Sequence, residues 1–418
     1  MTVRDALTTR GWAFASAGGA LLLAGLGLGL RDLTRIGVLL LALPLISGIL
    51  ARRHNLDVEV ERTLRPMRVS VGDVATVRME IVNRGRLSTP LLIAEERLDH
   101  VLGDRPRFLI ARTRPGQRRR VDYQVRSHLR GRHQLGPVVV QVRDPFGMSL
   151  RGSAVGAPSR IVVRPRVVPL GDRHPPGSGV GAEGEIPFMV ALHGEDDVSI
   201  REFRDGDDLR RIHWPATAHS GELMVRQEDR PARRRAIILL DPRESAHRGT
   251  GVSSSFESAV TATASIIDHL NNAGYAVHLV AVETVQDERA ADALDTDRAL
   301  DLLAVVKTWP AAELGPLVRA AQTVGAAGGL LVAVVAGGGE DELRTIASLR
   351  HPGNTALAMV IDPAGFQDGP PQLSAPRGAD PADLFRHTGW SVGVLHQGQS
   401  VAEAWAGVPP GRRGVFTG

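Results

Sequence analysis

Residues Phe203 to Arg226 form a short segment rich in side chains that could do chemistry. This segment, FRDGDDLRRIHWPATAHSGELMVR, contains four arginines, four carboxylates, two histidines and a tryptophan. Such a cluster could grip a phosphate through its arginines, hold a metal through its histidines and aspartates, or tie two domains together by ion pairs. The rest of the chain has to decide among these hypotheses.

The metal hypothesis is the weakest of the three. His213 and His219 could join Asp207 and Asp208 as ligands, but the two histidines lack the i, i+4 spacing of a helical zinc site. Neighbouring arginines also bring fixed positive charge into the group. We therefore predict that the segment serves architecture or docking.

In the favoured interpretation, Ile212 and Trp214 bury against the last domain and the charged neighbours form ion pairs that fix a domain interface. A surface for an outside protein is the alternative, because Trp and Arg are the commonest interface anchors, and ligand binding is a third. The predicted signature and interface residues are Arg201, Phe203, Gly206, Asp207, Asp208, Arg210, Arg211, Ile212, His213, Trp214, Ala216 and Arg226.

A second candidate follows the apolar run AIILL, residues 236–240. Asp241 comes directly after this run and Ser245 four residues later. In open parallel sheets ligands bind beyond the carboxyl ends of the strands, so this exit is a natural place for a site.

Other catalytic signals are weak. GWSVG, residues 389–393, fits the nucleophile-elbow pattern with His396 nearby, but Ser391 begins a run that itself predicts a strand, whereas an elbow needs strand, turn and then helix. The chain has no Walker A loop and no cysteine, which excludes a phosphate loop of its own, thiolate zinc sites and cysteine nucleophiles. We predict that the protein is not an enzyme.

Composition indicates a folded, multidomain chain. At 418 residues it exceeds one ordinary core, and 43% apolar with 23% charged residues is normal globular content. The net charge is only +4, arginines are scattered, and aromatics are 4%, so we predict no nucleic-acid binding.

Two uncharged stretches near the start, Gly11–Leu30 and Ile36–Ala51, predict a transmembrane helical hairpin with the loop RDLTR between them. Glycines in the first stretch would let the helices approach closely. A signal peptide or a buried soluble hairpin are the alternatives. Positive charge is concentrated outside the loop, which predicts that both chain ends and the body after residue 52 face the cytoplasm. The residues counted are Arg4 and Arg10 before the first stretch, Arg31 and Arg35 between the two, and Arg52, Arg53, Arg62 and Arg65 after the second.

The pattern of apolar residues changes twice in the remaining sequence. Alternating short runs from Leu56 to Val168 predict an antiparallel β-sandwich of about six or seven strands, in which DPFG (144–147) is a turn. After a Gly/Pro-rich joint, apolar runs at 236–240, 276–282, 330–336, 356–361 and 391–395 alternate with amphipathic helices, which predicts a doubly wound α/β sheet. The predicted domains are a hairpin at 1–54, a sandwich at 55–170, the linker and signature at 171–234, and the α/β domain at 235–418.

REFRDGDDLRRIHWPATAHSGELMVRQ followed by AIILLD resembles the signature of the bacterial domain of unknown function 58 family. Members of that family similarly pair an amino-terminal hydrophobic hairpin, an immunoglobulin-like region with an RG…LGP…DPFG run, and a von Willebrand factor A-like end. Here the run consists of Arg130, Gly131, Leu135, Gly136, Pro137, Asp144, Pro145, Phe146 and Gly147.

The resemblance implies a scaffold or adaptor in an envelope-related, chaperone-like system, working beside a MoxR-type AAA+ ATPase at the inner or plasma membrane. Von Willebrand A domains coordinate Mg²⁺ through Asp-x-Ser-x-Ser, and against that pattern Asp241 and Ser245 match while Arg243 replaces the middle serine. Glycines 337–339 stand where a later aspartate is expected, with Glu340 and Asp341 nearby. We therefore expect a degenerate domain without cofactor; the alternative is a Mg²⁺-dependent enzyme or Mg²⁺-binding interaction domain using Asp241 and Ser245.

Overall fold

The computed structural model describes residues 4–53, 57–144, 146–172, 199–202, 212, 214–227, 234–310, 313–326, 328–351, 354–366 and 380–409. The chain divides into two compact units, which are described separately. The first consists of Met1–Val167 with Leu300–Lys307, and the second of Val168–Ala299 with Thr308–Gly418.

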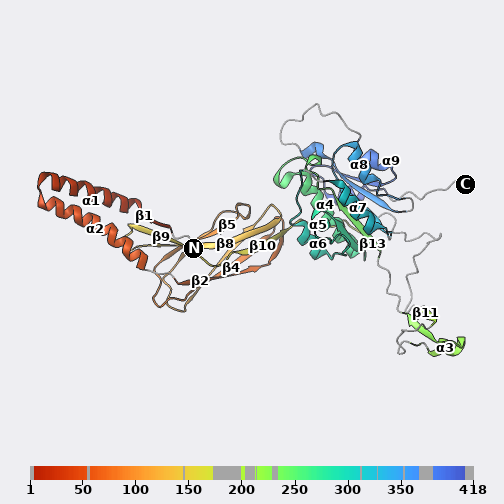
Figure 1. Cartoon of the computed structure of the whole chain (residues 1–418), viewed down its shortest axis with the longest axis horizontal. Coiled ribbons are helices and arrows are strands. Elements are labelled where there is room, and N and C mark those ends of the chain that lie inside the picture. Colours follow the sequence, from red (N-terminus) through yellow and green to blue (C-terminus); the bar gives the residue numbers. More distant parts are fainter. Residues whose placement is uncertain are drawn as a thin grey trace. The chain divides into compact units, whose positions relative to one another are not determined.

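The first unit begins with a short strand and two long apolar helices. β1 (Arg4–Leu7) precedes α1 (Thr9–Leu28) and α2 (Arg31–Arg53), and the two helices lie side by side (Figure 1). The stretches Thr9–Leu28 and Arg31–Ile49 are long and apolar enough to cross a membrane. The two predicted apolar helices are therefore present.

Glycines allow these helices to approach closely. A Cβ atom on Gly25 would lie 2.6 Å from the backbone nitrogen of Thr34, and one on Gly37 would lie 2.6 Å from that of Leu22. A Cβ atom on Gly18 would lie 3.0 Å from Leu41, so the predicted packing role is confirmed for Gly18 and Gly25. It is not confirmed for Gly19, Gly27 and Gly29, where an added Cβ atom would meet nothing within 4 Å.

The predicted five-residue loop between the helices is wrong. Only Gly29 and Leu30 connect them, and the segment RDLTR forms the first turns of α2. Gly29 adopts φ +70° and donates its N–H to the Gly25 carbonyl, so the left-handed cap ends α1 abruptly and lets α2 begin at Arg31.

Two sheets form a β-sandwich. The smaller sheet has the order β2-β4-β7, and the larger has the order β1-β9-β8-β10-β3 with β5 beside β8 and β6 beside β5. All of these pairs are antiparallel except β10 with β3. The strands are β2 (Val58–Arg65), β3 (Arg68–Ser70), β4 (Val74–Asn83), β5 (Leu92–Leu98), β6 (Arg107–Ile110), β7 (Arg118–Arg126), β8 (Gly131–Arg143), β9 (Ser149–Val155) and β10 (Ser159–Arg164).

Alternating side chains from both sheets fill the sandwich. Val77 and Met79 of β4 are fully buried, as are Leu135 and Val138 of β8, in two clusters that each draw on both sheets. This period-two burial is what the alternating sequence predicted. The prediction of an antiparallel sandwich is confirmed, with more strands than expected.

The sandwich also buries an ion pair that the sequence did not reveal. Arg62 Nε donates to Glu96 Oε1 at 3.0 Å, and both side chains are almost completely buried. Burial raises the pKa of Glu96 even though Arg62 opposes this shift. A Cβ atom on Gly136 would lie 2.7 Å from Arg62 Nη2, so the glycine of the LGP run makes room for this arginine.

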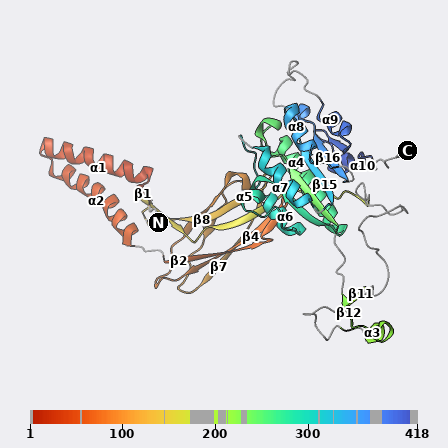
Figure 2. The same ribbon diagram turned by 45° about the vertical axis from the view of Figure 1, so that its right-hand side comes forward.

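The second unit contains a five-stranded parallel sheet with the order β14-β13-β15-β16-β17, flanked by helices (Figure 2). Its strands are β13 (Arg235–Leu240), β14 (Ala276–Val280), β15 (Leu330–Val335), β16 (Ala356–Ile361) and β17 (Ser391–Leu395). All five predicted strands are confirmed. Strand order reverses after β13 and β14, so β13 and β15 flank the topological switch point of the sheet.

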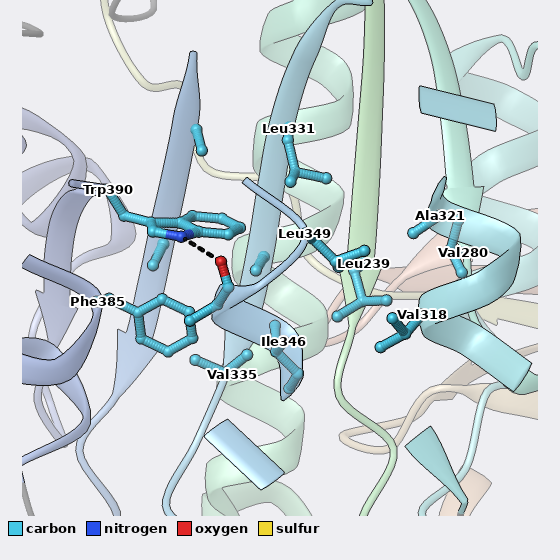
Figure 3. Close-up of a cluster of buried hydrophobic side chains, with 14 of the residues drawn as sticks. Leu239, Val280, Val318, Ala321, Leu331, Val335, Ile346, Leu349, Phe385 and Trp390 are labelled. Carbon is cyan, nitrogen blue, oxygen red and sulfur yellow. Dashed lines mark hydrogen bonds between the residues drawn. The ribbon is translucent and has the colours of Figure 1, made fainter. Parts of the chain in front are cut away.

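Helices cover both faces of this sheet, as a doubly wound domain requires. α4 (Ser255–Asn272) contacts β13, β14, β15 and β16, and α10 (Val401–Ala406) packs beside α4. The helices associated with the other face are α5 (Val282–Gln286), α7 (Leu314–Gly325), α8 (Glu340–Ala347) and α9 (Pro381–His387), and α6 (Thr296–Leu303) precedes α7 in the chain. Figure 3 shows the core between the sheet and these helices, where Trp390 Nε1 donates to the Ala347 carbonyl at 3.1 Å beside Phe385.

The signature segment is described only in part. β11 (Ser199–Glu202) pairs antiparallel with β12 (Met224–Gln227), and α3 (Trp214–Ser220) lies between them in sequence. Met224 N–H donates to Thr217 Oγ1 at 3.0 Å, which joins the helix to the second strand.

Candidate functional site

The candidate site lies at the carboxyl end of β13. Asp241 follows the last residue of this strand, is completely buried, and donates its N–H to the Val334 carbonyl of β15 at 3.0 Å. The site therefore sits at the switch point between β13 and β15, where doubly wound sheets usually bind ligands.

Arg243 fills this position with its guanidinium. Its Nε donates to Asp241 Oδ1 at 2.9 Å and its Nη2 donates to Asp241 Oδ2 at 2.6 Å, while its own N–H also reaches Oδ1 at 3.1 Å. The side chain of Arg243 is only 3% exposed. Both carboxylate oxygens of Asp241 are thus committed to one neighbouring cation.

Glu342 of α8 completes the cluster. Arg243 Nη1 donates to Glu342 Oε2, and Nη2 also reaches the Gly337 carbonyl at 3.3 Å. The same Glu342 oxygen accepts the Gly339 N–H at 3.1 Å, which ties the start of α8 to the arginine. A Cβ atom on Gly338 would lie 2.6 Å from Arg243 Nη1, so the glycines after β15 make room for the guanidinium.

Electrostatics favour a permanently charged pair here. Burial disfavours the charged form of Arg243, but the hydrogen bonds and charges of Asp241 and Glu342 outweigh it and raise the pKa of the guanidinium. Arg243 therefore supplies a fixed positive charge in the cluster.

His247 links the end of β13 to the start of α4. Its Nε2 lies 3.1 Å from the Asp241 carbonyl oxygen and its Nδ1 lies 3.1 Å from Ser255 Oγ at the start of α4. Its ring packs edge-on against Phe256. Burial lowers the pKa of His247, so the buried ring is held neutral at neutral pH.

The structure does not bring the predicted metal residues together as a ligand set. Ser245 is exposed, and its backbone carbonyl accepts from Arg248 at 2.8 Å. Glu340 and Asp341, singled out from the sequence, instead pair with Arg344 on the surface of α8. Across the described ranges no group of three or more His, Asp or Glu side chains is arranged to hold a metal. The residues present do not fit Mg²⁺, because the oxygens of Asp241 are bonded to Arg243.

Glu342 and His247 were missed by the sequence analysis. Glu342 stands three residues after Gly339, the position from which a carboxylate reaches back to a helix start, and that spacing could have identified it. His247 carries no comparable signal, because its partners are a backbone carbonyl and a serine on the next helix.

The signature segment differs from its prediction at Trp214. This side chain is 66% exposed, and Ile212 is only half-buried, so the structure does not show the predicted burial of either residue. The reason is local: none of the seven residues of α3 is buried, so this helix makes no core contact that would cover the indole. Ala216 is half-buried in the same helix.

Arg201 and Arg226 lie in the backbone ladder of β11 and β12, where Ile200 stands opposite Arg226 and Arg201 opposite Val225. The remaining signature residues lie outside the described ranges, so their predicted ion pairs stay predictions. They are Phe203, Gly206, Asp207, Asp208, Arg210, Arg211 and His213.

Ser391 is the first residue of β17, where it pairs with Leu357 of β16. The GWSVG segment is therefore turn and strand, as predicted, and lacks the strand-to-helix turn of a nucleophile elbow. His396 Nδ1 lies 3.0 Å from Asp362 Oδ2 at the other end of that strand.

Solved structures similar to part of the chain are remote. The CARDB domain of the PF1109 protein from Pyrococcus furiosus, solved with di-metal ions, is 14% identical, with 26% of this chain and 90% of that chain covered and a TM-score of 0.20. The putative ApaA protein from Bordetella pertussis is 13% identical over 26% of this chain and 94% of its own, with a TM-score of 0.20. The alkylpurine DNA glycosylase AlkC from Pseudomonas fluorescens, solved with DNA containing an abasic site analogue, is 14% identical over 32% and 40%, with a TM-score of 0.21.

No curated protein matches the chain significantly. Residues 199–326, which include the signature segment, β13, Asp241 and Arg243, match the family described as protein of unknown function DUF58. Residues 199–326 of the chain therefore carry the DUF58 family region, as the resemblance of the signature segment predicted.

Proposed function

We propose that this protein is a membrane-anchored adaptor of a bacterial inner or plasma membrane, with its body in the cytoplasm. The hairpin α1–α2 is the anchor, the sandwich is an immunoglobulin-like spacer, and the parallel α/β domain is a degenerate von Willebrand A-like interaction domain. Two helices long enough to span a bilayer and the match of residues 199–326 to the DUF58 family support this arrangement.

The observation that carries the proposal is the guanidinium of Arg243 in the place where an ion or substrate would bind. Asp241 and Glu342 are both bonded to Arg243, so the guanidinium of this residue occupies the ligand position at the switch point. An α/β domain of this kind then acts through its surface, by holding another protein, and needs no cofactor.

We place the partner contact on the exposed Trp214 of the signature segment. A two-thirds exposed indole, in a sequence segment that contains several arginines, has the composition of an interface anchor. The partner that the family resemblance suggests is a MoxR-type AAA+ ATPase. This chain has no Walker A loop, so the partner would carry out any ATP hydrolysis.

Affinity capture of the tagged full chain from native membranes tests this proposal. The wild type is expected to recover an AAA+ ATPase, and W214A is expected to lose it. W309A is the matched control, because Trp309 is also a partly exposed tryptophan, and its hydrogen bonds to Pro242 and Glu244 are made by its backbone, which the substitution leaves in place. Absence of any ATPase with the wild type would contradict the partner, and equal recovery with W214A would contradict the site.

A further inference from the structure

The DPFG turn joins the helical hairpin to the sandwich. The described residues of this turn, Asp144 and Phe146–Gly147, stand between β8 and β9. The Asp144 carboxylate accepts hydrogen bonds from Ser47 Oγ of α2, from the Phe146 N–H at 3.0 Å, and from the Ser149 N–H at 2.5 Å. One buried carboxylate thus holds its own turn and a helix 97 positions earlier in the chain.

The start of α1 is fixed to the same turn. Thr8 Oγ1 donates to the Gly147 carbonyl at 2.7 Å, and the Thr8 N–H donates to the Met148 carbonyl at 2.9 Å. A Cβ atom on Gly11 would lie 2.3 Å from that Met148 oxygen, so the helix and the turn are in direct backbone contact. β1 continues this attachment by pairing antiparallel with β9, as Figure 1 shows.

Through these contacts the DPFG turn lies beside one end of the two apolar helices. Thr9 is the first residue of one candidate span, and Ser47 lies two residues before Ile49, the last residue of the other. At about 1.5 Å per helical residue, Ser47 is only about 3 Å inside the end of its span. If the hairpin crosses a bilayer, the DPFG turn lies at the boundary between hydrocarbon and headgroups.

The exposed side chains around the turn suit that boundary. Phe146 is 49% exposed although it is a large apolar residue. Arg10 Nη1 and Arg143 Cδ lie 4.0 and 3.9 Å from the position a Gly147 Cβ would occupy, so both arginines flank the turn. Both arginines are exposed. Trp12, 65% exposed, follows in the first turn of α1.

We propose that Arg10, Arg143 and Phe146, here named the junction patch, bind the headgroup layer of anionic phospholipids. Phe146 enters the interface as an aromatic wedge, and the two arginines pair with lipid phosphates. Asp144 is a positioning residue that holds the patch at this depth through Ser47. This inference rests on the proposed membrane anchoring, and it adds that the sandwich touches the bilayer surface.

The absence of cysteine makes the test direct, because single cysteines can be placed in the otherwise native full chain. The variants F146C, M67C and L23C are labelled with a small fluorophore and reconstituted into vesicles of phosphatidylcholine and phosphatidylglycerol. Quenching is measured with phospholipid spin-labelled near its headgroup or at mid-chain.

Met67 is the matched control for Phe146. It is 68% exposed, and its carbonyl accepts from Val162, which pairs with Arg132 near the start of β8. Phe146 follows the opposite end of that strand, about 40 Å away at roughly 3.3 Å per residue. Leu23 reports the hairpin itself, because it is an exposed apolar residue within the span of α1.

We expect the label at position 146 to be quenched severalfold more strongly than the label at 67 by headgroup-proximal spin label, and the label at 23 to be quenched by mid-chain spin label. Vesicles without phosphatidylglycerol, or the added changes R10Q and R143Q, should reduce quenching at 146 severalfold. If position 23 is quenched while 146 behaves like 67, the junction patch is refuted and the anchor stands. Quenching at 146 that ignores lipid charge refutes the phosphate pairing, and no quenching at 23 overturns both proposals.

Discussion

Arg243 and Asp241 are joined by two parallel hydrogen bonds, from Nε to Oδ1 at 2.9 Å and from Nη2 to Oδ2 at 2.6 Å, at the carboxyl end of β13. The planar guanidinium matches the carboxylate in the bidentate geometry that gives such pairs their specificity. The buried guanidinium of Arg243 is part of the chain and neutralises the Asp241 carboxylate permanently, whereas a bound cation would do so reversibly.

The wild-type chain should bind no Mg²⁺ through Asp241, because both carboxylate oxygens already accept hydrogen bonds from Arg243. Calorimetric titration of the full chain with MgCl₂, with D241A as control, measures this. Heat that saturates in the wild type and disappears in D241A would support the Mg²⁺-dependent alternative and retire the adaptor-only proposal.

The substitution R243A should lower the free energy of unfolding of the α/β domain by about 3 to 5 kcal/mol, because it leaves the buried Asp241 carboxylate without its partner. The control is R344A, which removes an exposed pair with Glu340 and should cost only about 0.5 kcal/mol. Denaturant titration of the full chain compares the two. Similar losses for both variants would show that the Arg243 pair is not the buried element described here.

Acidification should destabilise the α/β domain through His247. Burial lowers the pKa of this ring below its ordinary value of 6.5, so the unfolded state binds the proton more readily than the folded state. The stabilising contribution is therefore complete above pH 6.5 and is lost as pH falls through the lower pKa of the folded ring.

Hydrogen exchange of β13 and α4 at pH values on both sides of this window, corrected for intrinsic rates, checks the prediction. The substitution H247N should weaken the pH dependence. His278, whose pKa is also lowered by burial, should carry the remainder. An unchanged pH profile in H247N would contradict the assignment to His247.

The substitution D144A should loosen the hairpin from the sandwich, because it removes the acceptor of Ser47 and leaves the N–H groups of Phe146 and Ser149 without it. Each buried donor left unpaired costs about 1 to 3 kcal/mol. Faster backbone exchange in β1 and β9 is the expected sign, with S47A giving a smaller effect.

D122A is the control for this experiment, because Asp122 pairs with Arg78 on the exposed face of the small sheet. Exchange in β1 and β9 should be unchanged in that variant. Equal protection of β1 in D144A and the wild type would argue that the strand pairing alone holds the hairpin.

Elements with a strong hydrophobic period were predictable from the sequence. Strands β15 and β16 are uninterrupted apolar runs, and β4 alternates between buried and more exposed residues from Val74 to Ile81. The helix pair was equally clear. β1 was not, because four residues with the sequence RDAL have no period and become a strand only by pairing with β9.

The candidate site shows the same division. Asp241 and the intrusion of Arg243 could be anticipated, because position relative to a strand end is a local property. Glu342 was passed over in favour of Glu340 and Asp341, since the direction of a side chain on α8 depends on where that helix starts and turns. The partnership of Asp144 with Ser47 joins residues 97 positions apart, and no local pattern encodes it.

The pairing of β1 with β9 has a mechanical consequence. Tension between the helices and the sandwich is borne by two routes, the covalent chain leading from α2 into β2 and the hydrogen-bonded ladder of Arg4–Leu7 against Ser149–Gly152. Because both ends of the helix pair are connected to the sandwich, rotation of the sandwich relative to the helices is more restricted than it would be with a single connection. A force applied to the sandwich would therefore be transmitted to both helices.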